Sequence, residues 1–182
     1  DQLTPPNKLY LSMLKTKSIG TNASIHFLTR QIANNPDILN EQTLKLLFPR
    51  PYYEIFDRVS ESTDTNLVLA VARQESGFNP MARSPANARG LLQLLPSTAR
   101  MLTNERYPNL YNEETNATLG VKFLSRLIER FGSVEHALIG YNAGPGRVGE
   151  WKRRFPNAPN SMLFLDLIPF NETRNYVSSI LR

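Results

Sequence analysis

The chain has 182 residues, of which 41% are hydrophobic and 20% charged, a composition typical of a globular domain with a real core. It contains no cysteine, which excludes disulfides and thiolate chemistry, and its longest uninterrupted apolar run, Leu67 to Ala72, is far too short to cross a bilayer. The net charge of +5 and the pI of about 9.6 favour an anionic partner, such as nucleic acid, a membrane surface or an acidic polymer like a cell wall. The basic residues are scattered singly apart from the run 152–154, so no stripe for nucleic acid is present and none is predicted as a partner.

The first 50 residues are expected to form short helices that are interrupted by prolines. One helix is predicted from Asn22 to about Asn34 and a second from Glu41 to Phe48. No chemical motif precedes Tyr52, so residues 1–48 are predicted to be a helical appendage or the end of a preceding helical domain. Because the chain begins without Met or an apolar targeting stretch, we expect a removed leader or a piece of a longer protein.

Residues 49–182 are predicted to form a second, mainly helical domain. Strand signals are poor, and at most a small sheet is expected between Phe78 and Leu94. Eight of the nine glycines lie between Gly77 and Gly149, which makes this region the first choice for a site. Predicted helices cover 53–59, 65–75, 96–103, 112–131, 133–142, 145–155 and 171–181, with caps at Asn112 and Ser133 and a stop at Gly132.

Glu75 stands at the end of the apolar helix that begins at Thr65, where a negative charge is disfavoured. No acidic residue follows it until Glu105, and its neighbours are apolar, small or aromatic. Burial and the helix end both raise the pKa of a carboxyl group, which would let Glu75 donate a proton near neutral pH and then take one back. From position alone, a structural ion pair with an arginine such as Arg83 or Arg89 is an equally good reading.

Three sequence blocks in order resemble the catalytic domain of soluble lytic transglycosylases, over about residues 50–182. The first runs from Glu75-Ser76 through Ala82-Arg83-Ser84 to Gly90-Leu-Leu-Gln-Leu-Leu-Pro96. The second is Gly140-Tyr-Asn-Ala-Gly144, and the third holds Glu172-Thr173 and Tyr176. Any one block would be weak evidence, but three in the family's order are strong.

The resemblance implies a lysozyme-like fold, α+β in class, with helices around a substrate cleft and a small sheet. It also implies cleavage of the β-1,4 bond between N-acetylmuramic acid and N-acetylglucosamine in peptidoglycan, with a 1,6-anhydro product and no added water. Glu75 matches the family's single catalytic glutamate, acting as acid and then as base. Tyr141 and Asn142 would hydrogen-bond the acetamido group or Glu75, and Gln93 and Ser84 would bind polar groups of the sugars. The full set of expected substrate-binding residues is Ser76, Ser84, Leu92, Gln93, Leu95, Tyr141, Asn142, Ala143, Glu172 and Tyr176.

The chain departs from the family pattern at four positions, of which Gly140, in place of alanine, is the smallest change. Leu92 and Leu95 replace two methionines, which keeps apolarity but alters binding detail. Asn87 stands where glycine is common, and asparagine tolerates the left-handed backbone such a turn needs. Glu172 fits the first turn of a helix by itself, so it is assigned groove or structural support and not the catalytic acid.

Other conspicuous side chains receive structural or secondary roles. His26 and His136 are too far apart in sequence to suggest a histidine metal site, and neither a metal nor a cofactor is predicted. Trp151 and Tyr107 could stack on sugars, although a lone tryptophan is more often a core residue. The run Lys152-Arg153-Arg154 is usually a solvated face, or it could meet the carboxylates of peptide stems.

Two other functions fit part of these observations. A goose-type lysozyme would share the fold and the glutamate but hydrolyse the bond, and a non-catalytic wall-binding module would lack turnover altogether. The joint presence of Glu75, Gln93 and Tyr141 argues against the second. The expected partners are glycan strands of peptidoglycan, with other cell-wall proteins as further candidates, and the expected location is the periplasm or cell envelope of a bacterium.

Overall fold

The structure is a computed structural model that describes residues 21–156, 158 and 161–181. The part of the predicted appendage that precedes Thr21 lies outside these described residues. The chain divides into two compact units, residues 1–52 with 77–79, and residues 53–76 with 80–182. The boundary predicted after residue 48 and the role of an appendage stay predictions.

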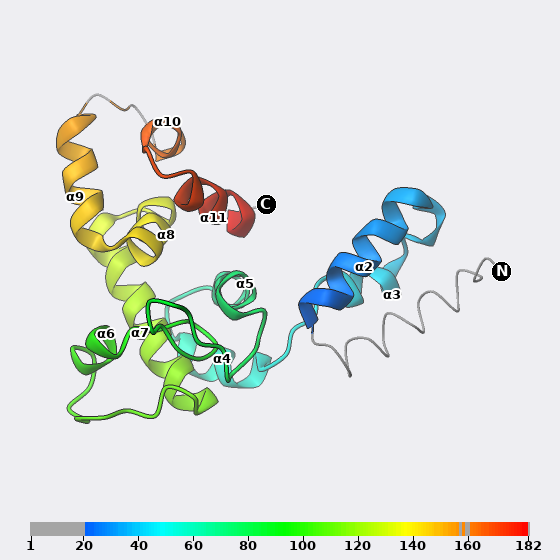
Figure 1. The fold of residues 1–182 in the computed structure, drawn as a ribbon, viewed down its shortest axis with the longest axis horizontal. Coiled ribbons are helices and arrows are strands. Elements are labelled where there is room, and N and C mark those ends of the chain that lie inside the picture. The colour runs from blue at the N-terminus through cyan, green and yellow to red at the C-terminus, as the bar shows by residue number, and fades with distance from the viewer. Residues whose placement is uncertain (1–20, 157, 159–160, 182) are drawn as a thin grey trace. The chain divides into compact units, whose positions relative to one another are not determined.

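The described helices of the first unit are α2 (Thr21–Asn34), the 3-10 helix η1 (Pro36–Ile38) and α3 (Glu41–Leu47) (Figure 1). The side chain of Asn40 accepts hydrogen bonds from the backbone N–H groups of Gln42 and Thr43, and the Thr43 hydroxyl accepts from the Asn40 backbone N–H. This capping box satisfies donors that the first turn of α3 would otherwise leave open. The first two predicted helices are therefore confirmed to within a residue at each end.

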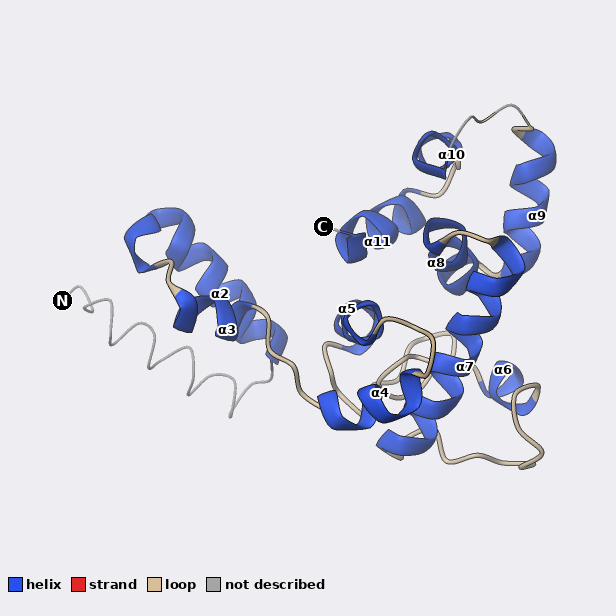
Figure 2. Cartoon of the chain, turned by 180° about the vertical axis from the view of Figure 1, so that it is seen from behind, coloured by secondary structure: helices blue, strands red, loops and turns tan. Residues whose placement is uncertain are grey.

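Helices are the only regular secondary structure in the described residues of the second unit, and no strand is drawn in Figure 2. Its longest helix, α7, contacts α4 and α8, while α8 also contacts α9, α10 and α11. The mainly helical fold class is confirmed. The helices are α4 (Tyr53–Ser60), α5 (Thr65–Ser76), α6 (Pro96–Arg100), α7 (Glu113–Phe131), α8 (Val134–Ala143), α9 (Pro145–Arg154), α10 (Ser161–Leu167) and α11 (Asn171–Leu181).

The predicted helix boundaries in this unit have local causes that the structure displays. The Asn112 side chain accepts from the Thr115 N–H at the start of α7, and Gly132 ends that helix in the left-handed conformation with φ of 65°. The Ser133 hydroxyl accepts from the His136 N–H at the start of α8. Two details of this unit differ from expectation: α6 ends at Arg100 and not near Thr103, and α10 was not predicted. In the first unit, η1 was not predicted either.

The small sheet expected between Phe78 and Leu94 is absent as a sheet. This segment contains only two isolated antiparallel bridges, Arg83 to Arg89 and Arg89 to Leu94. Tight turns interrupt any strand: the N–H of Asn87 donates to the Ser84 carbonyl, and the N–H of Gln93 donates to the Gly90 carbonyl. Asn87 has a φ of 68°, the left-handed conformation that its side chain was expected to tolerate.

The core of the second unit gathers on α7 and α8. Leu124 of α7, Leu138 and Ile139 of α8, and Phe56 of α4 are all fully buried. Each such side chain contributes roughly 1.5–3 kcal/mol by leaving water, which makes this core a rigid base for the loops around it. Among the described helices, none is both long and apolar enough to cross a membrane.

Candidate active site

Glu75 lies in the last turn of α5, and its carboxyl group meets a residue from the far end of the chain. The hydroxyl of Tyr176, on α11, donates a hydrogen bond of 2.7 Å to Glu75 Oε1. Helices α5 and α11 contact each other, which explains how two residues 101 positions apart become neighbours. Glu75 has no ion pair among the described residues, so the arginine partner considered from the sequence is not present there.

The environment raises the pKa of Glu75 from 4.5 to about 7. Removal of the carboxyl group from water is the largest cause, because burial disfavours the charged form. The hydrogen bond from Tyr176 acts in the opposite direction, since it stabilises the carboxylate, and the nearby charge of Glu172 adds to the increase. A group with this pKa is close to half protonated at neutral pH, which suits proton donation followed by proton acceptance.

Tyr141, on α8, is tied to the loop that precedes α6. Its hydroxyl donates a 2.7 Å hydrogen bond to the carbonyl oxygen of Leu92, and its ring lies 5.2 Å from that of Phe123. Burial, with a smaller effect from the charge of Glu75, raises the pKa of Tyr141 well above its ordinary value, so the phenol stays neutral. Of the two tyrosines predicted at the site, Tyr176 and not Tyr141 donates to the Glu75 carboxyl group.

The side chain of Asn142 is held by Thr173, a member of the third block to which the sequence assigned no role. The hydroxyl of Thr173, which is 1% exposed, donates to Asn142 Oδ1 at 2.7 Å. This bond joins α8 to α11, one residue from Tyr141 and three residues from Tyr176 along the chain. The Glu-Thr pair of the third block could have indicated it, because threonine in the first turn of α11 is the only neighbour of Glu172 able to donate through a hydroxyl.

Three polar side chains expected to contact sugars form hydrogen bonds that hold the 82–94 loop in its shape. The Ser76 hydroxyl is 2.8 Å from the Leu91 carbonyl oxygen, and the Ser84 hydroxyl accepts from the Ala88 N–H at 3.0 Å. The Gln93 amide nitrogen donates to the carbonyls of Ala82 and Gly90. These bonds fix the shape of the loop that receives Tyr141. The predicted contacts of the three residues with sugar stay predictions.

Asn116, on α7, is the main organising residue that sequence reasoning missed. Its side chain is completely buried, accepts from the Leu92 N–H at 2.8 Å, and donates to the carbonyls of Arg89 and Leu110 at 2.8 and 2.9 Å. The close approach leaves no room at Gly90, where an added Cβ would lie 2.1 Å from the Leu110 carbonyl oxygen. A polar residue inside the apolar stripe of a predicted helix was the available signal.

The two leucines that replace methionines occupy different environments. Leu92 is 1% exposed and packs on Gly120, where a Cβ would lie 2.3 Å from its Cδ1. The expectation that the Leu92 side chain lines a sugar groove is therefore wrong, because core packing covers it. Leu95 is 40% exposed, and Ala143 is partly exposed at the end of α8, so both remain available to a ligand.

The remaining candidates are located as follows. Glu172 is exposed in the first turn of α11, and its role as groove or structural support stays a prediction. Trp151 is 2% exposed and meets Phe170 edge to face, so it is a core residue. The ring of His136 lies against Phe164 and its Nδ1 is 3.1 Å from the Ser133 hydroxyl, a structural environment. Within the described residues no cluster of potential metal ligands occurs.

A comparison with protein families identifies the class of this chain. The family described as "Transglycosylase SLT domain" matches residues 53–164, which include Glu75, the 82–94 loop and Tyr141. The match covers more than half of the chain, and the chain therefore belongs to this family.

Individual relatives share the name of the activity. The chain is 37% identical over 144 residues to the "Soluble lytic murein transglycosylase" of Salmonella typhimurium and 35% identical to that of Escherichia coli K12. Each alignment covers 74% of this chain but 22% of the relative, so the chain spans about a fifth of the length of these proteins.

Solved structures of longer proteins share the fold. A 70-kDa soluble lytic transglycosylase in complex with bulgecin A superposes with a TM-score of 0.80 at 28% identity, covering 99% of this chain and 30% of that one. The lytic transglycosylase Slt of Pseudomonas aeruginosa, solved as an inactive mutant in which glutamine replaces a glutamate, gives 0.77 at 27% identity, covering 93% and 28%. These similarities establish the lysozyme-like transglycosylase fold for this chain.

Proposed function

We propose that this chain is the catalytic domain of a peptidoglycan lytic transglycosylase that acts in the bacterial cell envelope. Its substrate is the glycan strand, cut between N-acetylmuramic acid and N-acetylglucosamine, and its product carries a 1,6-anhydro ring. Family membership and the names of the relatives support the reaction class. The single observation that carries the mechanism is the partly buried Glu75 carboxyl group with a pKa of about 7 and one tyrosine donor.

The proton balance of the reaction needs one carboxyl group. Protonated Glu75 donates its proton to the glycosidic oxygen, and the bond from that oxygen to C1 of muramic acid breaks. The C6 hydroxyl oxygen of the same sugar then bonds to C1, and its proton passes to the Glu75 carboxylate. The glutamate ends as it began and no water is consumed. An intramolecular nucleophile removes the need for a second carboxylate to activate water.

The surrounding residues have roles that follow from their contacts. Tyr176 holds one oxygen of Glu75 and orients the other toward the sugar, while its stabilisation of the carboxylate prevents the pKa from rising further. Tyr141 fixes the Leu92 carbonyl and hence the loop beside the bond to be cut. Asn142 accepts a hydrogen bond from Thr173, and in this proposal it contacts the acetamido group that supports the positive charge at C1. The P. aeruginosa relative was solved as an inactive mutant in which glutamine replaces one glutamate. Loss of activity from replacing a single glutamate is the result that this one-carboxylate scheme requires.

Product mass distinguishes the proposal from its rivals. Purified peptidoglycan is digested with the protein and the fragments are analysed by mass spectrometry. We expect muramic acid ends that lack one water relative to reducing ends. Reducing ends throughout would identify a hydrolase of the goose-type lysozyme kind, and an intact polymer would identify a non-catalytic wall-binding module.

A further inference from the structure

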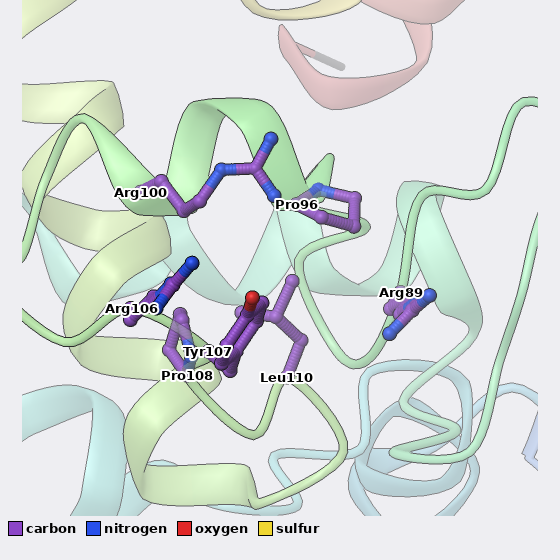
Figure 3. A pocket seen from close by; sticks show the side chains of 7 residues that line it. All are labelled: Arg89, Pro96, Arg100, Arg106, Tyr107, Pro108 and Leu110. Carbon is purple, nitrogen blue, oxygen red and sulfur yellow. The ribbon is translucent and has the colours of Figure 1, made fainter.

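A basic pocket on the second unit takes no part in the mechanism above. Its cavity volume is about 80 Å³. Three arginines from different segments line it: Arg89 from the 82–94 loop, Arg100 from the end of α6, and Arg106 from the segment that follows. In Figure 3 Arg106 and Arg89 lie at opposite sides of the pocket, Arg100 and Pro96 along one edge, and Tyr107, Pro108 and Leu110 along the facing edge.

The charge of this pocket is not balanced within the described residues. No acidic side chain lines it, and none of the three arginines has an ion pair among the described residues. Arg89 donates to Asn87 Oδ1 through Nε and Nη2, which uses part of its five N–H donors and fixes its direction. Arg106 lies 5.3 Å over the ring of Tyr107. Two of the guanidinium groups are therefore held in place while donors stay available to a ligand.

The chemistry of the pocket selects a carboxylate on a short aliphatic group. A guanidinium presents paired donors that match the two oxygens of a carboxylate. Pro96, Leu110 and the exposed ring of Tyr107 offer apolar contact to a small side chain next to that carboxylate. A cavity of about 80 Å³ suits a single small group such as a carboxylate and not a whole polymer chain.

The pocket adjoins the loop of the candidate active site. Arg89 exchanges two backbone hydrogen bonds with Leu94, and its carbonyl accepts from Asn116, the residue that also holds the Leu92 N–H. The Cα atoms of Arg89 and Leu92 are separated by three residues, at most about 11 Å of extended chain. Leu95, which is 40% exposed, directly precedes Pro96 in the pocket lining, so a ligand attached to a sugar at Leu95 is within reach of the pocket.

We propose that the pocket of Arg89, Arg100 and Arg106 binds a carboxylate of the peptide stem that muramic acid carries. The proposal rests on the proposed function, because it takes peptidoglycan as the substrate. It makes the enzyme selective for glycan that bears peptide over bare glycan. It also assigns to these three arginines the stem contact that the sequence suggested for Lys152-Arg153-Arg154.

Binding to an enzyme that cannot turn over tests the proposal directly. Glu75→Gln serves as the parent, and its affinity is measured by calorimetry for glycan fragments with stems and for fragments of equal length whose stems an amidase has removed. We expect the parent to prefer the first ligand, and Arg89→Gln/Arg100→Gln in that background to bind it roughly fivefold to thirtyfold more weakly, the factor that loss of charged hydrogen bonds produces. Binding of stem-free glycan should not change.

Two controls separate a specific site from general charge attraction. Arg126→Gln/Arg153→Gln removes the same charge from exposed positions on α7 and α9, outside the pocket, and should leave both affinities within about twofold. Amidating the stem carboxyl groups keeps the peptide but removes its charge, so parent and pocket variant should bind that ligand alike. Thermal melting verifies that each variant is folded.

The possible failures are distinguishable from failure of the proposed function. Equal loss of affinity for stem-free glycan, equal loss in the control variant, or no loss at all overturns the pocket assignment. If the parent binds stem-free glycan as tightly as stem-bearing glycan, the pocket proposal alone fails. If it binds neither, the proposed function fails as well.

Discussion

At Glu75 three physical effects act on one carboxyl group. Burial and the charge of Glu172 favour the protonated form, and the Tyr176 hydrogen bond favours the ionised form. Burial dominates, which leaves the pKa at about 7. The Tyr176 hydrogen bond and the Glu172 charge can each be removed by one substitution, and the two substitutions should shift the pKa of Glu75 in opposite directions.

Replacing Glu75 by glutamine tests whether its proton is essential. Glu75→Gln keeps the size and hydrogen bonding of the side chain but cannot transfer a proton, so turnover of peptidoglycan should fall by about 10²–10⁴-fold or more. Glu172→Gln should cost much less, because Glu172 is exposed and outside the proton pathway. A folded Glu75→Gln protein with near wild-type turnover would overturn the assignment and make Glu172 the residue to examine.

The same variant should change the pH dependence of stability. The folded protein retains the Glu75 proton that the unfolded chain releases near pH 4.5, so ionisation costs stability as pH rises from about 4.5 to about 7. The full cost, on the order of 3 kcal/mol or less, is present above pH 7 and absent below pH 4.5. Glu75→Gln should therefore melt at a higher temperature than wild type at pH 8 and at a similar temperature at pH 4. A constant difference across this range would contradict the raised pKa.

Removing the Tyr176 hydroxyl should move the pH profile of activity. Tyr176→Phe deletes the bond that lowers the Glu75 pKa, so the protonated acid persists to higher pH and the alkaline limb of kcat/KM shifts upward. Tyr141→Phe is the matched control. It deletes a hydroxyl that donates to Leu92 and not to Glu75, so it should lower the rate without moving that limb. An unmoved limb in Tyr176→Phe, or equal shifts in both variants, would show that the hydrogen bond does not set the pKa.

At the scale of elements, α7 holds the active-site loop through one buried amide. Asn116 satisfies one N–H and two carbonyl groups of residues 89–110. Each buried group left without a partner costs about 1–3 kcal/mol. The loop is consequently anchored to α7, although it forms no sheet of its own.

Asn116→Ala should destabilise the protein by about 2–5 kcal/mol in urea unfolding. Asn116→Asp retains the acceptor for Leu92 but places an oxygen opposite two carbonyls, so it should also be destabilising. The control is Asn175→Ala on the exposed face of α11, for which a change within about 0.5 kcal/mol is expected. Similar stability of Asn116→Ala and the control would show that the loop does not depend on this amide.

At the scale of the whole molecule, the chain separates into two compact units, and every contact of the candidate site described above lies in the second. The first unit has its own small core with Ile25, Leu28 and Ile38. No chemical motif occurs in residues 1–48, so we predict that this part has no catalytic role.

A truncation that begins near Pro49 should therefore retain turnover of short glycan fragments. Digestion rates for short and long glycans, measured with the full and truncated chains, separate two roles for the removed part. Loss confined to long polymers would indicate that residues 1–48 guide the substrate. Complete loss on short glycans by a truncated protein that still melts cooperatively would contradict the prediction.

The sequence by itself determined the features that depend on near neighbours. The ends of α7 and α8 follow from caps such as Asn112 and Ser133, whose partners lie three residues away. The position of Glu75 at the end of an apolar helix was likewise visible, together with the tendency of burial to raise its pKa. The short helix α10 was missed because an apolar run such as 162–165 fits a strand as well as a helix.

Only the tertiary structure decided which side chains meet. Tyr176 reaches Glu75 across 101 residues, Tyr141 reaches Leu92 across 49, and Asn116 reaches Leu92 across 24. Such contacts depend on how the helices pack, and the periodicity of a single helix does not specify its neighbour. For the same reason Leu92 is a core residue packed on Gly120, although its sequence block suggested a groove. The local pattern placed the acid, and the packing of α5 against α11 supplied the hydroxyl that it meets.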